Sequence, residues 1–142
     1  MNIKPRTDSI GYLFVNICKV RRNKANELFS KYGIHAGQDI LLYHLMREDG
    51  QTVSGLVENI CVQHATLSNM ISRMECNGLV CRTKDDNDMR VSRIFLTDRG
   101  KEAIQQVRDV WKELELQTIK GLTTEERILL KRLLQHVLGN FE

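Results

Sequence analysis

Apolar residues between positions 63 and 78 recur at the three- and four-residue spacing of an amphipathic helix. They are Leu67, Met70, Ile71 and Met74, which this spacing places along one helix face. Gly78 follows, and a glycine directly after a helix readily adopts the left-handed conformation that ends it. The pattern therefore predicts a helix that packs its apolar stripe on a core.

The other face of this helix is polar and carries mostly short side chains. Short side chains let a backbone approach base edges, asparagine pairs with adenine, methyl groups contact thymine, and arginine reaches guanine or a phosphate. Gln63, where the helix starts, is a weak N-cap residue. The face is either a surface that reads DNA or an ordinary solvated helix face, and its residues are Ala65, Thr66, Ser68, Asn69, Ser72 and Arg73.

Two short strands joined by an acidic turn follow this helix. Apolar and β-branched residues predict strands over 79–82 and 91–96, with a polar turn at 85–88. Thr97 is predicted to cap a long helix that begins near Asp98. A helix, a charged hairpin and a helix in this order indicate a winged helix-turn-helix. The cations in or near its wing are predicted to contact DNA and are Arg82, Lys84, Arg90 and Arg93.

These residues resemble the MarR-type transcriptional regulators, over nearly the whole chain. The resemblance is densest in segments 73–82, 88–90 and 96–100, which look like the end of the recognition helix, the wing and the next helix start. It implies that Asp88 orients Arg90 toward the minor groove or its phosphates, which suits an arginine in a narrow, electronegative groove. The alternative is a plain ion pair within the wing.

The first half of the chain predicts three further helices and one strand. Helices are expected over 8–32 and 36–47, and a short strand over 51–53. Ser54 is expected to cap a brief helix that ends near residue 60. This brief helix would be the first helix of the helix-turn-helix.

The last third of the chain is predicted to be nearly all helix. Thr123 and Glu126 form a capping box that separates two apolar stripes. The first stripe has the spacing of a helix that packs on another helix and consists of Ile104, Val107, Trp111, Leu114 and Thr118. The second needs burial by another surface and consists of Leu130, Leu133, Leu134, Val137, Leu138 and Phe141.

The expected fold is mainly α with a small β wing: a winged helix-turn-helix plus N- and C-terminal dimerisation helices. We expect one unit over 1–142, in which 34–100 is the DNA-binding domain and 1–33 and 101–142 supply the dimerisation helices, as the resemblance implies. A two-fold homodimer places two recognition helices about one turn of DNA apart. The partner is then double-stranded DNA with an imperfectly palindromic operator.

The composition is compatible with this interpretation but does not by itself indicate DNA binding. A net charge of +3 over 142 residues is only mildly basic, so a nucleic-acid surface depends on local clustering of cations. No apolar run reaches the roughly 18 to 20 residues of a membrane span, and the start, with Lys4, Pro5 and Arg6, lacks the apolar region of a signal peptide. We expect a cytoplasmic protein.

The four cysteines form no CxxC pair and predict no metal site. We expect Cys18, Cys61 and Cys81 to be small core residues. Cys76 differs, because the helical period places it on the polar side of the recognition helix. It is the candidate redox residue, where an oxidised thiol would oppose DNA docking.

The resemblance also implies repression of a promoter and release by a small amphipathic or anionic aromatic effector. No cofactor is predicted, and no phosphate loop, nucleophile elbow or HExxH motif indicates an enzyme. The alternatives are a repressor that senses thiol oxidation and a winged-helix module that binds protein. The candidate effector-binding residues are Tyr12, His35, Gln38, Tyr43 and His44.

Overall fold

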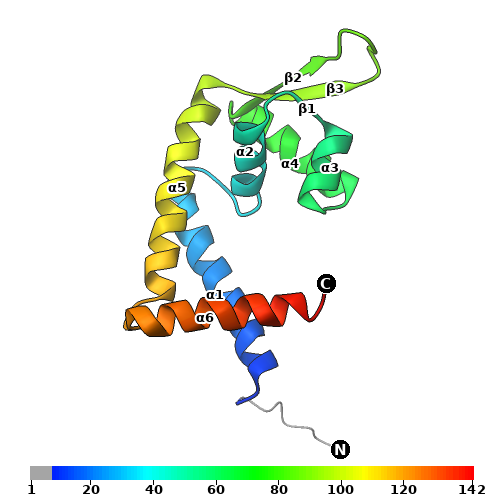
Figure 1. The fold of residues 1–142 in the computed structure, drawn as a ribbon. Helices are drawn as coiled ribbons and strands as arrows, with labels where there is room; N and C mark the ends of the chain where they lie inside the picture. Colours follow the sequence, from blue (N-terminus) through cyan, green and yellow to red (C-terminus); the bar gives the residue numbers. More distant parts are fainter. Residues whose placement is uncertain (1–7) are drawn as a thin grey trace, which may run out of the picture.

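The structure is a computed structural model that describes residues 8–142. Residues 1–7, with Lys4, Pro5 and Arg6 on which part of the cytoplasmic expectation rests, lie outside the described residues. The described chain forms six helices and three strands (Figure 1). Their bounds are α1 Ile10–Ser30, α2 Gln38–Arg47, β1 Gln51–Thr52, α3 Val53–Ile60, α4 His64–Cys76, β2 Val80–Lys84, β3 Ser92–Leu96, α5 Asp98–Thr118 and α6 Thr124–Gly139.

A small antiparallel sheet and the helices α2, α3 and α4 pack together as the winged helix-turn-helix. The strand order is β1-β3-β2, so that β3 pairs with both neighbours and β2 lies at the edge. The hairpin of β2 and β3 projects from the body at the end away from α6 (Figure 1). Helix α5 joins the two parts of the molecule, because it packs on α2 near the sheet and on α1 further along. The expected fold class is confirmed.

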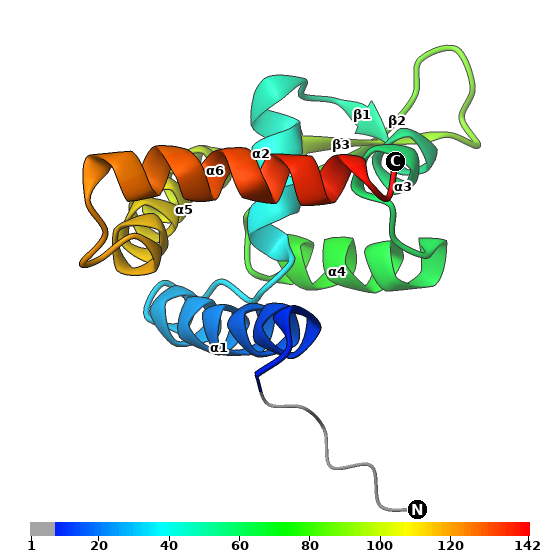
Figure 2. The same ribbon diagram turned by 60° about the horizontal axis from the view of Figure 1, so that its bottom comes forward.

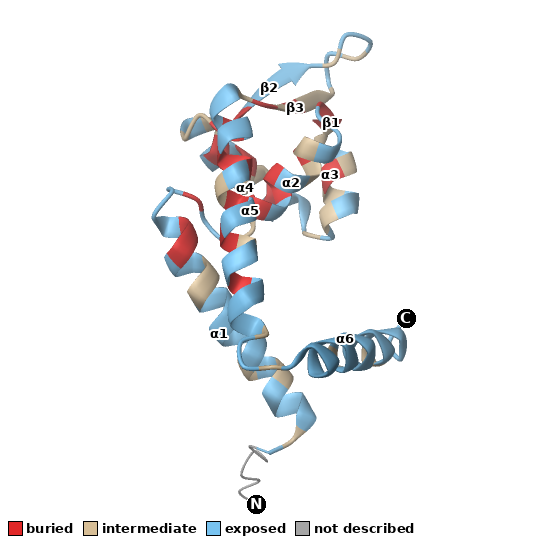
Figure 3. Ribbon diagram, turned by 60° about the vertical axis from the view of Figure 1, so that its left-hand side comes forward, coloured by how far each residue is buried: buried red, intermediate tan, exposed pale blue. Residues whose placement is uncertain are grey.

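The core lies within the winged part of the molecule and along α5. Its fully buried side chains include Leu42 of α2, Leu56 of α3, Ile71 of α4 and Ile94 of β3, and α5 closes the cluster with Val107. Figure 3 shows these elements with buried segments, whereas α6 has no buried segment. Helix α6 contains no buried residue, so residues 8–142 leave most of its apolar stripe uncovered.

The predicted amphipathic helix is α4. Leu67, Ile71 and Met74 are buried, and Met70 is partly buried against the same core. No side-chain hydrogen bond caps the helix start at residue 63, as the weak N-cap preference of glutamine predicts. At the other end Gly78 has a φ of 72°, the left-handed conformation that glycine tolerates.

Two predicted helix caps are confirmed and one is wrong. The Thr97 side chain accepts from the Gly100 N–H at 3.0 Å, and the capping box of Thr123 with Glu126 is present. The expected cap of α3 at Ser54 is wrong, because Thr52, which still has an extended backbone, accepts from the Gly55 N–H at 3.1 Å. A threonine at a strand end can stand directly before a helix, which leaves position 54 inside the first turn.

Helices α1 and α2 are shorter than predicted. Helix α1 begins at Ile10 rather than residue 8, because the Ser9 hydroxyl caps it by accepting from the Tyr12 N–H at 3.1 Å. Helix α2 begins at Gln38 rather than residue 36, after Gly37 with a φ of 94°. The apolar period alone extends a helix across its caps, so local capping geometry decides these ends.

The expectation that Cys18, Cys61 and Cys81 are core residues is wrong for the described chain. All four cysteines, including Cys76, are exposed. Cys61 occupies the turn between α3 and α4 with a left-handed backbone, φ 57°. Cys81 lies on β2, where every residue after Val80 is exposed.

Candidate DNA-binding interface

Helix α4 presents the predicted polar face to solvent. Ala65, Thr66, Asn69, Ser72 and Arg73 are exposed, and Ser68 is half-buried. The Ser72 hydroxyl donates to the Ser68 carbonyl at 3.0 Å within the helix. None of the described hydrogen bonds or ion pairs uses the side chain of Asn69 or Arg73, so both remain available to a ligand outside the chain.

An ion pair holds α4 to the wing. Both Nε and Nη2 of Arg82 on β2 donate to Glu75 Oε1 on α4, at 3.2 and 3.1 Å. Each side chain is about one-third exposed, so water screens the pair and its contribution to stability is small. The geometry nevertheless fixes the guanidinium of Arg82 beside the last turn of α4. The sequence predicted that Arg82 contacts DNA, but it did not predict the ion pair with Glu75.

The wing tip presents one arginine to solvent on a carboxylate support. Asp88 Oδ1 accepts from Nε of Arg90 at 3.1 Å and from its backbone N–H at 3.0 Å. The Arg90 side chain is 91% exposed, while its guanidinium is oriented by the carboxylate. These contacts with Arg90 lower the pKa of Asp88, because they favour the charged carboxylate. The contact between Asp88 and Arg90 is present, and its role in presenting Arg90 to DNA stays a prediction.

A second ion pair lies at the base of the wing. Arg93 Nε donates to Asp85 Oδ1 at 2.5 Å, and Arg93 Nη1 donates to the Gly50 carbonyl at 2.9 Å. The Asp85 side chain is only 14% exposed, and the contact with Arg93 lowers the pKa of its carboxyl group. The sequence predicted Asp85 only as part of a polar turn. An aspartate that starts such a turn is nevertheless the signal of an Asx-turn.

Lys84 is the remaining predicted cation of the wing. It lies at the end of β2, is exposed, and takes part in none of the ion pairs of residues 8–142. The wing therefore carries two cations that face solvent, Lys84 and Arg90, and two that are held by the fold, Arg82 and Arg93.

Cys76 lines an open hollow beside the end of α4. The hollow has a volume of about 360 Å³, and its lining residues are His35, Ser72, Arg73, Cys76 and Asn77. The exposed position of Cys76 on the polar side of α4 is as predicted. The hollow lies at the end of the helix face that carries the candidate base-reading residues.

The candidate effector-binding residues form two contacting pairs and one separate residue. Gln38 is buried, and its side chain accepts from the His35 N–H at 3.1 Å. Tyr43 and His44 meet edge to face with ring centroids 6.1 Å apart. Tyr12 lies on α1 and contributes backbone groups to hydrogen bonds within that helix. The described chain alone does not gather these residues into one pocket.

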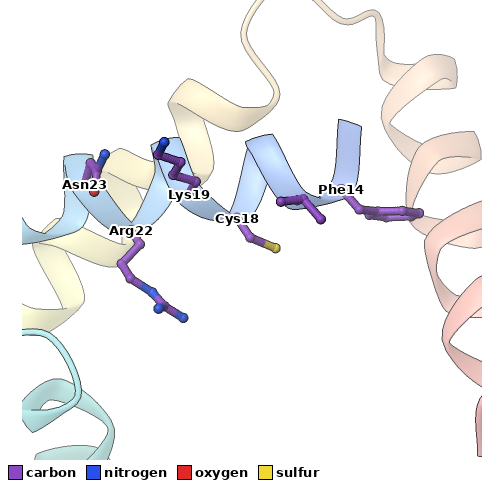
Figure 4. Close-up of a pocket in the computed structure, with 6 residues that line it drawn as sticks. Phe14, Cys18, Lys19, Arg22 and Asn23 are labelled. Carbon is purple, nitrogen blue, oxygen red and sulfur yellow. The ribbon is translucent and has the colours of Figure 1, made fainter. Parts of the chain in front are cut away.

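A groove of about 560 Å³ runs along α1. Its lining residues all belong to that helix and are Phe14, Val15, Cys18, Lys19, Arg22 and Asn23. Figure 4 shows Phe14 pointing from α1 toward a neighbouring helix, with Cys18 and Arg22 on the open side. Figure 2 shows α1 and α6 as two separate helices, with α6 passing in front of α2. The groove is lined by apolar side chains such as Phe14 and Val15 and by the cations Lys19 and Arg22.

No helix in residues 8–142 combines the length and apolar character needed to cross a bilayer. The fold, the exposed polar face of α4 and the arginine-tipped wing define a winged helix-turn-helix transcriptional regulator that binds DNA. The model of the MarR family matches residues 37–92. The chain belongs to the MarR family of transcriptional regulators.

Individual relatives agree with this assignment. The chain is 31% identical over 111 residues to YsmB, an uncharacterized HTH-type transcriptional regulator of Bacillus subtilis, covering 78% of this chain and 76% of YsmB. The crystal structure of apo MarR from E. coli matches with a TM-score of 0.78 and 28% identity, over 92% and 97% of the two chains. Bordetella bronchiseptica BpsR, whose DNA binding is regulated by 6-hydroxynicotinic acid, shares the fold with a TM-score of 0.79 and 19% identity, over 94% and 96%.

Proposed function

We propose that this MarR family protein is a cytoplasmic, homodimeric repressor that inserts α4 into the major groove of its operator and the wing into the adjacent minor groove. Arg90 is the observation that carries the proposal. Its side chain is 91% exposed and yet oriented by Asp88, and an oriented arginine suits a narrow minor groove. A wing that bound only protein would not need this arrangement.

The roles of the interface residues divide into reading and positioning. On α4 we assign contacts with base edges to the short polar side chains, and a phosphate or guanine contact to Arg73. On the wing we assign contacts to Lys84 and Arg90, because both are exposed cations. The base-reading residues of this proposal are Ala65, Thr66, Ser68, Asn69 and Ser72.

The dimer is proposed from the apolar surface that residues 8–142 leave uncovered. On α6 the exposed fractions are 67% for Ile128 and 60% for Leu138, Phe141 just after the helix is 86% exposed, and the α1 groove is open. Contiguous apolar surface of this kind marks a protein interface. A second copy of the chain supplies matching helices by two-fold symmetry, so that residues 1–33 and 101–142 form the dimerisation region and the operator is an imperfect palindrome.

Release by a small amphipathic or anionic aromatic effector is typical of the family. The effector acts if it favours a dimer whose two α4 helices no longer match the half-site spacing. Thiol oxidation is a second candidate, favoured by the exposure of Cys76 at the end of α4. Peroxide treatment then weakens DNA binding of the wild type and leaves Cys76→Ser unchanged. Equal sensitivity of both proteins counts against this route.

Fluorescence anisotropy with DNA from upstream of the protein's own gene, and with a scrambled duplex, tests the proposal. Binding weakens as salt rises: in a plot of the logarithm of the binding constant against the logarithm of the salt concentration, each phosphate contact adds about 0.9 to the steepness of the slope. The Arg90→Ala variant weakens binding to both duplexes and lowers the slope by about 1 per wing. Asn69→Ala instead reduces the preference between them, because it removes a base contact.

Lys112→Ala is the control for charge. Lys112 is exposed on α5, and its removal changes the net charge as much as removal of Arg90 does. We expect the slope of Lys112→Ala to equal that of the wild type. Absence of binding to either duplex at low salt, in both redox states, refutes the proposal in favour of a protein-binding module.

A further inference from the structure

We propose that Asp85 and Arg93 are positioning residues of DNA recognition, which hold the wing so that Asp88 can present Arg90 to the minor groove. This inference rests on the proposed contact between Arg90 and DNA. It changes the expected role of Arg93, which the sequence predicted to face DNA. The structure places its guanidinium between the wing and the body of the protein.

Arg93 connects the wing to the turn that precedes β1. The Nη1 group donates to the Gly50 carbonyl at 2.9 Å, across 43 residues of sequence. The Gly50 N–H in turn donates to the Ile94 carbonyl at 3.0 Å, so this turn is already tied to β3. The second guanidinium contact, from Nε to Asp85 Oδ1 at 2.5 Å, spans the hairpin between its two strands.

Asp85 passes the connection on to the tip of the wing. Its second oxygen, Oδ2, accepts from the backbone N–H groups of Asn87 and Asp88, both at 3.1 Å. The Asp85 N–H also donates to the Val91 carbonyl at 2.9 Å. The backbone of Asp88 is therefore fixed by the carboxylate of Asp85, and the carboxylate of Asp88 holds Arg90.

The Asp85–Arg93 ion pair is more buried than the Asp88–Arg90 ion pair. The Asp85 side chain is 14% exposed and that of Arg93 is 42% exposed, whereas Arg90 is 91% exposed. An arginine with both edges occupied by the fold is poorly placed to bind phosphate. A mobile arginine loses rotamer freedom when it binds, and that loss weakens binding by a factor of roughly five or more. Ordering the wing in advance reduces this loss.

Asp85 and Asp86 provide a matched pair of variants. Asp86 is adjacent and exposed, and none of the described hydrogen bonds or ion pairs uses its carboxylate. Replacing either by asparagine removes one negative charge from a loop that approaches DNA, which by itself strengthens binding. We expect Asp86→Asn to strengthen binding and Asp85→Asn to weaken it by roughly fivefold per wing. Equal changes in the two variants overturn the proposal.

Two variants of Arg93 separate a positioning role from a direct contact. Lysine keeps the charge for a phosphate but cannot reproduce the two contacts that Nε and Nη1 make in different directions. We therefore expect Arg93→Lys to weaken binding of the full-length protein about as much as Arg93→Gln. Near-wild-type affinity of Arg93→Lys overturns the proposal in favour of a phosphate contact.

A double-mutant cycle with Arg90→Ala provides the decisive measurement. If Arg93 acts through Arg90, then Arg93→Gln weakens DNA binding in the wild-type background and changes it less than about twofold in the Arg90→Ala background. An equal loss in both backgrounds overturns the proposal, whether Arg93 contacts DNA or only stabilises the fold. If Arg90→Ala alone has no effect on affinity, the proposed contact between the wing and DNA is wrong. This single variant therefore tests the proposed function separately from the role of Arg93.

Discussion

Gly100 is the position where we predict the largest effect of adding a single methyl group. It lies in the first turn of α5, directly after the wing. A Cβ atom there would stand 2.1 Å from the Leu79 carbonyl oxygen and 3.2 Å from Leu96 Cδ2. Cβ atoms essentially never approach another heavy atom closer than 3.0 Å, so the backbone would have to shift by at least 0.9 Å, the difference between 3.0 and 2.1 Å.

The cost of this shift follows from the contacts at the junction. The Leu79 carbonyl accepts from the Thr97 N–H at 3.1 Å, a hydrogen bond that contributes about 0.5–1.5 kcal/mol. The Thr97 cap of Gly100 contributes about 1 kcal/mol, and overpacking adds about 1–3 kcal/mol. Alanine returns about 1 kcal/mol through its helix propensity. The expected net loss for Gly100→Ala is about 1.5–4.5 kcal/mol in the free energy of unfolding.

Urea denaturation followed by circular dichroism at one fixed protein concentration measures this loss, because dimer stability depends on concentration. Gly11→Ala is the control, since Gly11 also lies near a helix start and has nothing within 4 Å of the added Cβ. We expect it to be neutral or stabilising by up to about 1 kcal/mol. If Gly100→Ala is as stable as Gly11→Ala, the close approach of α5 to the Leu79 backbone is wrong.

Three further predictions concern other parts of the molecule. Cys61→Asn raises the free energy of unfolding by about 0.5–1 kcal/mol in the same assay, and Cys61→Ala does not, because asparagine tolerates the left-handed backbone at φ 57°. Trp111→Phe lowers it by about 1.5–3 kcal/mol, because the indole N–H donates to the buried Asp39 carboxylate at 2.9 Å. Carboxyl NMR places the pKa of Asp85 below 3.8, and Arg93→Gln returns it toward 3.8, because the Arg93 contact favours the charged form. The folded pKa is the lower one, so this contact stabilises the fold above about pH 3.8 and is lost as the pH falls through the lowered pKa; an unchanged pKa in Arg93→Gln refutes the assignment.

The sequence by itself determined those features that depend on residues within one or two helical turns. The apolar stripe of α4 and the caps at Thr97 and Thr123 are local patterns, and each is present in the structure. The Asp88–Arg90 support spans three residues and was implied by the family resemblance. Such contacts form between neighbours in sequence, so residue type and spacing are enough to predict them.

Only the tertiary structure decided which cations face solvent and which are held by the protein. The partners of Arg82 and Arg93 lie 7 residues away on α4, 8 residues away across the hairpin, and 43 residues away at Gly50. Composition shows that all these cations exist but not which partner the fold brings within reach. The exposure of Cys61 and Cys81 is similar, because it depends on what packs over a turn and a wing strand. Contacts distant in sequence depend on closure of the whole fold, which a local pattern does not encode.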